Sequence, residues 1–238
     1  MTELNDFSEA AEYYDLVFAA RGKDYEAEAD AVESIVRERN PSARTLLDVA
    51  CGTGRHLAYF ARRLETFGID GDAKMLAIAK KRVPDVPLET GDMRAFSLGK
   101  QFDAIVCMFG SVTYAGGTEG LTKTVRTMRD HLAPGGVIVI EPFVGPADYR
   151  TEQLSVVNVD LPDLKLARMH VSARSGNTAI LDHHFLIAKR DGVRHFVERH
   201  ELALLDDADY AAAFAAAGLE VARVAHPALR LGVFVSRR

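Results

Sequence analysis

The chain has 238 residues, of which 48% are hydrophobic and 26% are charged. This balance excludes a disordered chain and is typical of a globular enzyme. The net charge of -5 and the pI near 5.9 argue against a nucleic-acid substrate, which would favour a basic face. The amino terminus lacks an apolar signal region and no segment approaches the about 18 apolar residues of a membrane span, so we expect a cytoplasmic protein.

Residues 1–25 form an arm that is rich in aromatic and charged side chains. It contains Tyr13-Tyr14-Asp15-Leu16 and Arg21-Gly22-Lys23-Asp24-Tyr25. We expect this arm to act as a lid that closes over a bound cofactor. An amphipathic helix is predicted to follow from Tyr25 to Arg39, because one side is apolar and the pattern stops at Asn40-Pro41.

The run from Leu46 to Gly54, with the sequence LLDVACGTG, is the most informative motif of the chain. An apolar strand that ends in Asp-x-Ala-x-Gly-x-Gly and enters a helix is typical of a loop that binds a nucleotide cofactor. A dinucleotide-binding loop would have a third glycine where this chain has Leu57. We therefore predict a cofactor without a pyrophosphate. The pattern indicates four cofactor contacts, which are Asp48, Ala50, Gly52 and Gly54.

The next predicted strand, Thr66 to Asp70, places the carboxylate of Asp70 where a doubly wound sheet holds the ribose of its cofactor. A short predicted strand, Val86 to Glu89, leads into Gly91-Asp92-Met93, where Asp92 can bind an adenine amino group and Met93 can flank the ring. Met75, on the helix after Asp70, can cover the other face of the ring. S-adenosylmethionine carries a ribose and no pyrophosphate, and it fits these features in order.

Strand and helix signals continue to alternate up to residue 140. They predict a strand at 102–107, a helix near 119–132, a turn at Ala133-Pro134-Gly135-Gly136 and a strand at 137–140. This alternation implies a buried parallel sheet with helices on both faces. With the glycine loop and Asp70, it resembles the class I S-adenosylmethionine-dependent methyltransferase fold, an α/β fold with a doubly wound, mostly parallel seven-stranded sheet.

The pattern changes after Glu141-Pro142. Segments 164–171, 179–189 and 193–205 are rich in β-forming residues and are separated by turn signals. They predict an antiparallel β-meander that occupies residues 146–205 as an insertion.

The α/β core is predicted to resume after the insertion. A helix at 207–217, capped by Gly218, precedes strands at 219–224 and 233–235. We expect this last pair to form an antiparallel edge of the sheet. The predicted cofactor-binding core therefore comprises residues 26–145 and 206–238.

A closer resemblance runs nearly from end to end and includes the inserted meander. It rests on Tyr14-Asp15-Leu16, Arg21-Gly22-Lys23-Asp24-Tyr25, Leu47 to Gly54, Gly91-Asp92-Met93-Arg94, Met108-Phe109, Glu141-Pro142, Arg174-Ser175-Gly176, Tyr210, Phe214 to Leu219 and Arg230. In these segments the chain resembles the N,N-dimethyltransferases of nucleotide-linked aminodeoxysugars, of the desosamine and mycaminose type. It departs from that family at Phe143-Val144, where paired tryptophans are usual, and at Gly110, where a serine is usual.

The resemblance implies a 3-aminodeoxysugar carried on thymidine diphosphate as the methyl acceptor, in the assembly of an antibiotic sugar. It also implies a homodimer that is joined in part through the inserted sheet. Further site residues follow from it, with Tyr14, Lys23 and Met108 at the cofactor and Phe109 and Ser111 at the acceptor.

Methyl transfer from a sulfonium needs an aligned, unprotonated amine more than it needs acid–base catalysis. Tyr114 follows the fourth strand, where mycaminose-type enzymes can carry a histidine. It can orient the amine or pass its proton to water, or it can simply form the pocket wall. Glu141, at the end of the fifth strand, can accept a hydrogen bond from the ammonium form, or it can be an ordinary surface hydrogen-bond partner.

An acceptor with two phosphates needs local cations in an acidic protein. Arg230 is the best candidate, with Arg168 and Arg174 from the inserted sheet as support, and a structural salt bridge is the alternative for Arg230. Four histidines fall on the antiparallel strands, which are His183, His184, His195 and His200. Alternation places His184 on the face opposite His183, so no shared metal site is predicted. Solvated or interface positions are expected for all four.

Three other functions stay open from the sequence. The first is methylation of a small natural-product precursor without a nucleotide. The second is methylation of a macromolecule, which the acidic charge and the absence of an Asn/Asp-Pro-Pro-Tyr loop at Met108–Ser111 disfavour. The third is a non-catalytic partner subunit that binds S-adenosylmethionine, against which the intact glycine loop argues.

Overall fold

The computed structural model describes residues 9–238 and contains a seven-stranded sheet in the order β10-β11-β5-β4-β1-β2-β3. Its strands are β1 (Thr45–Val49), β2 (Glu65–Asp70), β3 (Leu88–Thr90), β4 (Phe102–Cys107), β5 (Leu132–Ile140), β10 (Val221–His226) and β11 (Leu229–Arg237). β11 is antiparallel to both of its neighbours, and the other pairs are parallel. The predicted doubly wound, mostly parallel sheet with an antiparallel edge is confirmed.

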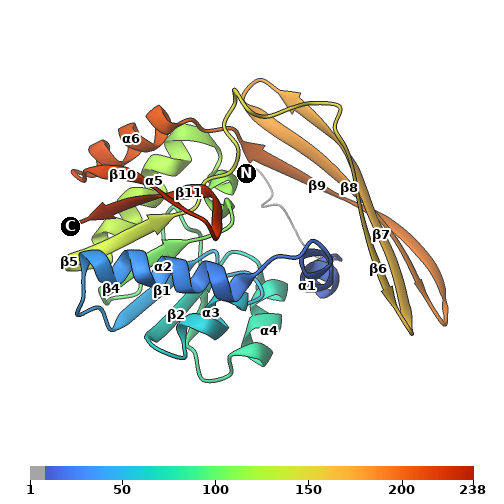
Figure 1. Cartoon of the computed structure of the whole chain (residues 1–238), viewed down its shortest axis with the longest axis horizontal. Helices are drawn as coiled ribbons and strands as arrows, with labels where there is room; N and C mark the ends of the chain where they lie inside the picture. The colour runs from blue at the N-terminus through green and yellow to red at the C-terminus, as the bar shows by residue number, and fades with distance from the viewer. Residues whose placement is uncertain (1–8) are drawn as a thin grey trace.

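Helices cover both faces of this sheet (Figure 1). They are α2 (Tyr25–Arg39), α3 (Arg55–Phe60), α4 (Ala73–Arg82), α5 (Gly117–Asp130) and α6 (Asp207–Ala216). Side chains alternate along each strand, so that the fully buried Leu46 packs with α2 and Leu47 packs with α5. The predicted helix from Tyr25 to Arg39 is confirmed as α2.

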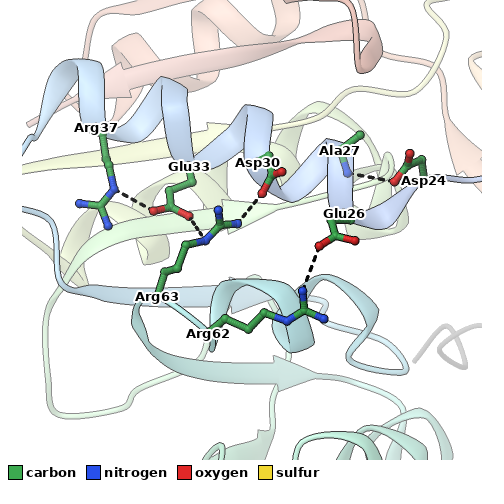
Figure 2. A network of polar contacts seen from close by, with 8 residues as sticks. All are labelled: Asp24, Glu26, Ala27, Asp30, Glu33, Arg37, Arg62 and Arg63. Carbon is green, nitrogen blue, oxygen red and sulfur yellow. Dashed lines mark hydrogen bonds and ion pairs between the residues drawn. The ribbon is translucent and has the colours of Figure 1, made fainter.

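Ion pairs fasten α2 to the residues that follow α3 (Figure 2). Arg62 pairs with Glu26 at 2.9 Å, and Arg63 pairs with Glu33 at 2.7 Å and also with Asp30. Glu33 is buried, so its pair with Arg63 is better shielded from solvent than the exposed Arg62–Glu26 pair. Because α3 begins at the glycine loop, these contacts hold that loop's helix against the rest of the core.

The second sheet is an insertion of four antiparallel strands in the order β6-β7-β8-β9. The strands are β6 (Leu154–Leu161), β7 (Leu164–Ser175), β8 (Thr178–Lys189) and β9 (Gly192–Ala203). The predicted meander is confirmed, but the sequence interpretation missed β6. The inward side chains of β6, Val157 and Val159, are buried through contacts with a distant helix, which local sequence does not reveal.

That helix is α1 (Ala11–Ala20), which lies between the core and the inserted sheet (Figure 1). The sequence indicated a lid arm here but no helix, and residues 1–8 of that arm lie outside the described residues. The backbone N–H of Ala10 donates to Glu198 Oε1 of β9 at 2.9 Å. One buried cluster joins α1 to the inner face of the inserted sheet, and it contains Ala10, Tyr13, Val17, Val157, Val159, Leu166, Phe185 and Ile187.

Two local predictions are corrected. The strand predicted at Val86–Glu89 is β3, which starts at Leu88 because Gly68 of β2 pairs with that residue. The turn predicted at Ala133–Gly136 belongs to β5, where the pairing with β4 shifts register between Phe102 and Ala104 and Gly135 has φ +75°. None of the helices found within residues 9–238 has the length and apolarity needed to cross a membrane.

Candidate active site

A cavity of about 2300 Å³ is lined by residues from the carboxyl ends of the core strands, from α1 and from the inserted sheet. Small-ligand sites usually measure about 300–1,000 Å³, so this cavity has room for a cofactor and an acceptor together. Most of the site residues expected from the sequence line it. Those outside its lining are Gly54, Asp92 and Arg174.

The glycine loop after β1 is shaped by the carboxylate of Asp70. Asp70 Oδ2 accepts the N–H of Gly52 at 2.7 Å, and Asp70 Oδ1 accepts the N–H of Asp72 at 2.8 Å. Gly52 has φ +56° and Gly54 has φ +74°, a conformation that favours glycine. Ala50 is also left-handed, with φ +59°. Asp70 therefore supports the loop as well as facing the place where a ribose is expected.

Helix α3 packs closely against strand β2 because the glycine at their contact lies on β2 and not on α3. A Cβ on Gly68 of β2 would lie 2.7 Å from Leu57 Cδ1 and 3.0 Å from Cys51 Sγ. The fully buried Leu57 thus occupies the space that Gly68 leaves free. This explains how the chain packs α3 against β2 without a third glycine in the loop.

Asp48 is a buried carboxylate that faces the cavity, and it is only 2% exposed. Burial first, and then the neighbouring Asp70, raise the pKa of Asp48 well above its usual range. A carboxylate in such surroundings favours a cationic ligand group. The ammonium of S-adenosylmethionine has that chemistry, so Asp48 and the loop fit this cofactor.

Two methionines are placed to flank an adenine ring. Met75 of α4 is buried, Met93 is half-buried, and both line the cavity. Asp92 is instead paired with Arg94 at 2.6 Å, and this pairing lowers the pKa of Asp92. The predicted contact between Asp92 and an adenine amino group would therefore have to be shared with Arg94.

A latch joins α1 to the glycine loop, and the sequence interpretation did not identify it. Asp15 Oδ1 accepts the hydroxyl of Thr53 at 2.8 Å and lies 3.3 Å from Arg55 Nε. Arg82 of α4 contacts both Asp15 and the carbonyl of Thr53. The sequence did show a carboxylate, Asp15, within the predicted aromatic arm. Its partners could not be recognised from the sequence, because they lie far from it along the chain.

Lys23 lies beside the cavity with its charge already paired. Its Nζ is 2.6 Å from Glu28 Oε2 and 3.7 Å from the centroid of the Phe109 ring. Glu28 Oε2 is also 2.7 Å from His56 Nε2. Lys23 therefore neutralises Glu28 and packs on Phe109, so a role at the cofactor would require it to share these contacts.

Glu141 positions the loop after β4. Its Oε2 accepts the N–H of Phe109 at 2.6 Å, and Phe109 has φ +59°. Burial raises the pKa of Glu141, which is 7% exposed. Met108 and Ser111, on either side of this turn, line the same cavity. Glu141 therefore has a positioning role in addition to the proposed contact with the acceptor.

The two departures from the family pattern noted above lie in contact. Gly110 has φ +68°, and a Cβ placed on it would come within 3.2 Å of Phe143 Cβ. Serine at position 110 would be strained by its backbone and crowded by Phe143. The glycine and the phenylalanine therefore fit each other, and they shape one edge of the cavity together.

Tyr114 connects the core wall to the inserted sheet. It lies in a short 3-10 helix, η1 (Ser111–Ala115), and its hydroxyl is 3.0 Å from His200 Nδ1 of β9. His200 Nε2 is in turn 3.6 Å from Glu198 Oε2. Burial raises the pKa of Tyr114, so the hydroxyl stays protonated at neutral pH. Sequence reasoning missed His200 as its partner.

The histidines of the inserted sheet divide between its two faces. His184 and His195 stack on the outer face, with ring centroids 5.5 Å apart, and both are exposed. His183 and His200 line the cavity on the inner face, a placement that the sequence interpretation did not specify. The predicted placement of His183 and His184 on opposite faces is confirmed.

The three candidate arginines have different surroundings. Arg168 is 5% exposed and faces the cavity, and Arg230 lines the cavity from β11. Arg230 forms no ion pair within residues 9–238. Arg174 instead donates to the carbonyls of Gly176 at 2.6 Å and Pro146 at 2.8 Å. It holds the turn between β7 and β8.

Comparison with known proteins places these features in a family. Residues 46–136 match the model of a methyltransferase domain. A dTDP-3-amino-3,4,6-trideoxy-alpha-D-glucopyranose N,N-dimethyltransferase of Streptomyces venezuelae is 45% identical over 213 residues, which are 89% of this chain and 90% of that protein. A dTDP-3-amino-3,6-dideoxy-alpha-D-glucopyranose N,N-dimethyltransferase of Streptomyces fradiae is 41% identical over 91% of this chain and 86% of its own length.

Solved structures agree with these relatives. The crystal structure of Streptomyces venezuelae DesVI superposes with a TM-score of 0.90 at 43% identity and covers 96% of this chain and 98% of its own. An amino pentose methyltransferase of Micromonospora echinaspora, solved with S-adenosylmethionine bound, gives a TM-score of 0.87 at 37% identity and covers 95% of this chain and 96% of its own.

The similarity to these proteins extends over both the core and the inserted sheet, whereas the methyltransferase-domain model matches only part of the core. They confirm the resemblance drawn from the sequence, including S-adenosylmethionine as the cofactor. The chain belongs to the N,N-dimethyltransferases of nucleotide-linked aminodeoxysugars and is an S-adenosylmethionine-dependent N-methyltransferase.

Proposed function

We propose that this chain methylates, in two successive transfers, the amino group of an aminodeoxysugar carried on thymidine diphosphate, in the assembly of an antibiotic sugar. The observation that carries the proposal is a single cavity that joins the cofactor loop to basic side chains of the inserted sheet. The printed activities of the relatives, which are dTDP-aminosugar N,N-dimethyltransferases, support it.

S-adenosylmethionine, when bound, supplies an activated methyl group, so the residues of the chain mainly have to hold, orient and shield. In this proposal Asp48 would bind its ammonium and Asp70 its ribose, while Ala50 and Gly52 would let the loop backbone approach. Gly54 would let the loop pack closely against Ala79 of α4. Asp15 keeps α1 closed over the loop, which excludes water from the transfer site. Tyr14, Lys23, Met75, Met93 and Met108 complete the cofactor wall, with Asp92 at its edge.

The acceptor amine is oriented by Tyr114 in this proposal. Its hydroxyl can accept a hydrogen bond from the unprotonated amine, and the proton released after transfer moves through this hydroxyl toward His200 Nδ1, 3.0 Å away. Phe109 and Ser111 flank the amine, and Glu141 holds the Phe109 turn in place. Arg168 and Arg230 offer cations to the phosphates, and Arg174 is left with a structural role.

We also propose a homodimer in which a second copy covers the outer face of the inserted sheet. Exposed apolar side chains gather on that face, as the strand pairing shows, and they are Val156, Met169, Val171, Leu186 and Val193. Such a patch is typical of a protein–protein contact. In this scheme residues 1–25 are the lid, 146–205 bind substrate and partner, and the rest is the cofactor core.

The proposal includes a cytoplasmic location. Cys51 and Cys107 are both buried and unpaired, and unpaired thiols are usual in a reducing compartment.

Mass spectrometry of the products tests the proposed activity. The enzyme is incubated with S-adenosylmethionine and either a TDP-linked 3-aminodeoxysugar, a TDP-linked 4-aminodeoxysugar or the matching free aminosugar. We expect one and then two added methyl groups on a nucleotide-linked sugar and none on the free sugar. Equal turnover of the free sugar would contradict the nucleotide requirement and favour a precursor without a nucleotide.

A further inference from the structure

Four basic side chains gather where the inserted sheet faces the cavity. They are Arg21, just after α1, Arg168 and His170 of β7, and His183 of β8, and we call them the Arg168 cluster. The guanidinium carbons of Arg168 and Arg21 lie 5.5 Å and 5.9 Å from the centroid of the same Phe18 ring. The rings of His170 and His183 have centroids 4.8 Å apart.

No acid forms an ion pair with a member of this cluster among residues 9–238. Arg168 is 5% exposed, and its Nε has no hydrogen-bond partner there. The buried Nδ1 of His170 also lacks a partner. The nearby Glu198 is occupied, since its Oε1 accepts the N–H of Ala10 at 2.9 Å and its Oε2 lies 3.6 Å from His200.

A buried guanidinium without a counterion is costly, and so is a buried imidazole nitrogen without a partner. Both costs are removed by one anionic ligand that accepts hydrogen bonds from several donors. The described residues offer no group of three side chains suited to a metal ion, and Arg168 and Arg21 would repel a cation. The chemistry of the cluster therefore favours a phosphate.

We infer that the Arg168 cluster is the subsite for the sugar-linked phosphate of the acceptor, and that His170 and His183 take up a proton when this phosphate enters. The inference rests on the proposed function, because it takes the acceptor to be a nucleotide-linked sugar. On an aminohexose, the anomeric phosphate lies only a ring's width from the amine. Arg168 lines the same cavity as Tyr114. The ring of His183, another member of the cluster, lies 4.8 Å from the ring of His200, whose Nδ1 is 3.0 Å from the Tyr114 hydroxyl.

Proton uptake follows from the charges around His183. Burial first, and then Arg168, His200, His170 and Arg21, lower the pKa of His183 to about 2. Glu198 stands opposite His183 across β8 and β9, while the preceding residue, Asp182, stands opposite Arg199 and pairs with it. A diphosphate would replace this positive field by a negative one and raise the pKa. Acceptor affinity should then increase as the pH falls.

The test uses TDP-glucose, which has no amine and whose doubly esterified diphosphate keeps its charge between about pH 6 and about pH 8.5. Its binding to the enzyme with S-adenosylhomocysteine is measured by calorimetry at both pH values. We expect wild-type affinity to rise at least about tenfold toward pH 6, as one linked proton allows. His183→Asn and His170→Asn should each reduce this rise, while His184→Asn, on the outer face, should preserve it.

The outcomes separate the subsite from the proposed function. If both inner-face variants fold, as shown by their melting temperatures, and keep wild-type affinity and pH dependence, the subsite inference is wrong even when the enzyme methylates a TDP-aminosugar. If the pH-dependent binding depends on His183 but no TDP-aminosugar is methylated, the subsite stands and the proposed function falls. If TDP-glucose does not bind at either pH, the subsite inference is overturned.

Discussion

The hydroxyl of Thr53 donates a 2.8 Å hydrogen bond to Asp15 Oδ1, and so the glycine loop and α1 are directly connected. Arg55 of α3 and Arg82 of α4 contact the same carboxylate. Any motion of α1 away from the core must break these contacts. The lid proposed from the sequence is therefore fastened at the point where the cofactor loop turns into α3.

Substitution of Asp15 should loosen this latch and weaken cofactor binding. We expect Asp15→Ala to raise the Kd for S-adenosylmethionine about tenfold. A charge-assisted hydrogen bond contributes about 1.5 to 3 kcal/mol, but only the part of this energy that holds α1 over the loop affects cofactor binding. Calorimetry measures the Kd. Glu12→Ala is the matched control, because Glu12 lies on the same helix and forms its ion pair with Lys189 of β8, at 3.8 Å. Equal affinities of both variants would show that the latch does not matter for binding.

Asp48 should lower the stability of the cofactor-free protein, although it is needed to bind the cofactor. Its pKa is raised in the folded state, so the folded protein holds a proton more tightly than the unfolded chain. Stability contributed by this group is then lost as the pH rises above about 4, the unfolded value. We expect Asp48→Asn to raise the melting temperature of the free enzyme at neutral pH and to abolish measurable S-adenosylmethionine binding. A lower melting temperature would indicate that Asp48 has a structural partner.

Asp70 should matter for affinity and for the shape of the loop. We expect Asp70→Ala to weaken S-adenosylmethionine binding by about 1 to 3 kcal/mol, because a buried acceptor for ribose hydroxyls and for the N–H of Gly52 is lost. Calorimetry gives the affinity, and hydrogen exchange of the Gly52 amide reports the loop. An unchanged dissociation constant would show that the ribose is held elsewhere.

Tyr114 should affect turnover and leave cofactor affinity alone. We expect Tyr114→Phe to lower kcat about 10- to 100-fold near neutral pH, with an unchanged Kd for S-adenosylmethionine. This loss is at or below the low end of what proton-transfer groups contribute, because acid–base catalysis is secondary in methyl transfer from a sulfonium. Part of the loss should be recovered at higher pH, where more of the amine is unprotonated. Tyr59→Phe, near the end of α3 and outside the cavity lining, is the control. A wild-type kcat for Tyr114→Phe would reduce Tyr114 to a pocket wall.

Arg230 should act on the acceptor alone. We expect Arg230→Ala to raise the KM for the nucleotide sugar tenfold or more, in line with about 1.5 to 3 kcal/mol for a charge-assisted hydrogen bond. Arg174→Ala, which removes an arginine outside the cavity, should leave KM nearly unchanged. A flat KM with a lower melting temperature for Arg230→Ala would identify a structural role instead.

The sequence predicted the core well because its signals are local. The glycine loop, Asp70 and the apolar runs of β1, β4 and β5 each specify their own structure within a few residues. The register of the sheet pairs Asp48 of β1 with Gly68 of β2, and so it brings Asp48 and Asp70 to the same carboxyl edge of the sheet. Those carboxylates could be assigned to a cofactor without knowledge of the rest of the chain.

The missed features all depend on contacts between distant segments. Strand β6 and helix α1 bury each other, so neither shows a complete pattern alone. His200 meets Tyr114 across 86 residues of sequence, and Asp15 meets Arg82 across 67. Arg174 appeared equivalent to Arg168 in the sequence, but the turn beside it supplies carbonyl groups that bind its guanidinium.

The bond between Ala10 and Glu198 spans 188 residues, and this has a consequence for how the protein is made. Chains emerge from the ribosome from the amino terminus at about 5–20 residues per second, so α1 waits roughly 10 to 40 seconds before its sheet is complete. During that time its apolar side can attract chaperones or other nascent chains. A codon change that slows translation between β5 and β9 should therefore lower the yield of folded enzyme without altering its sequence.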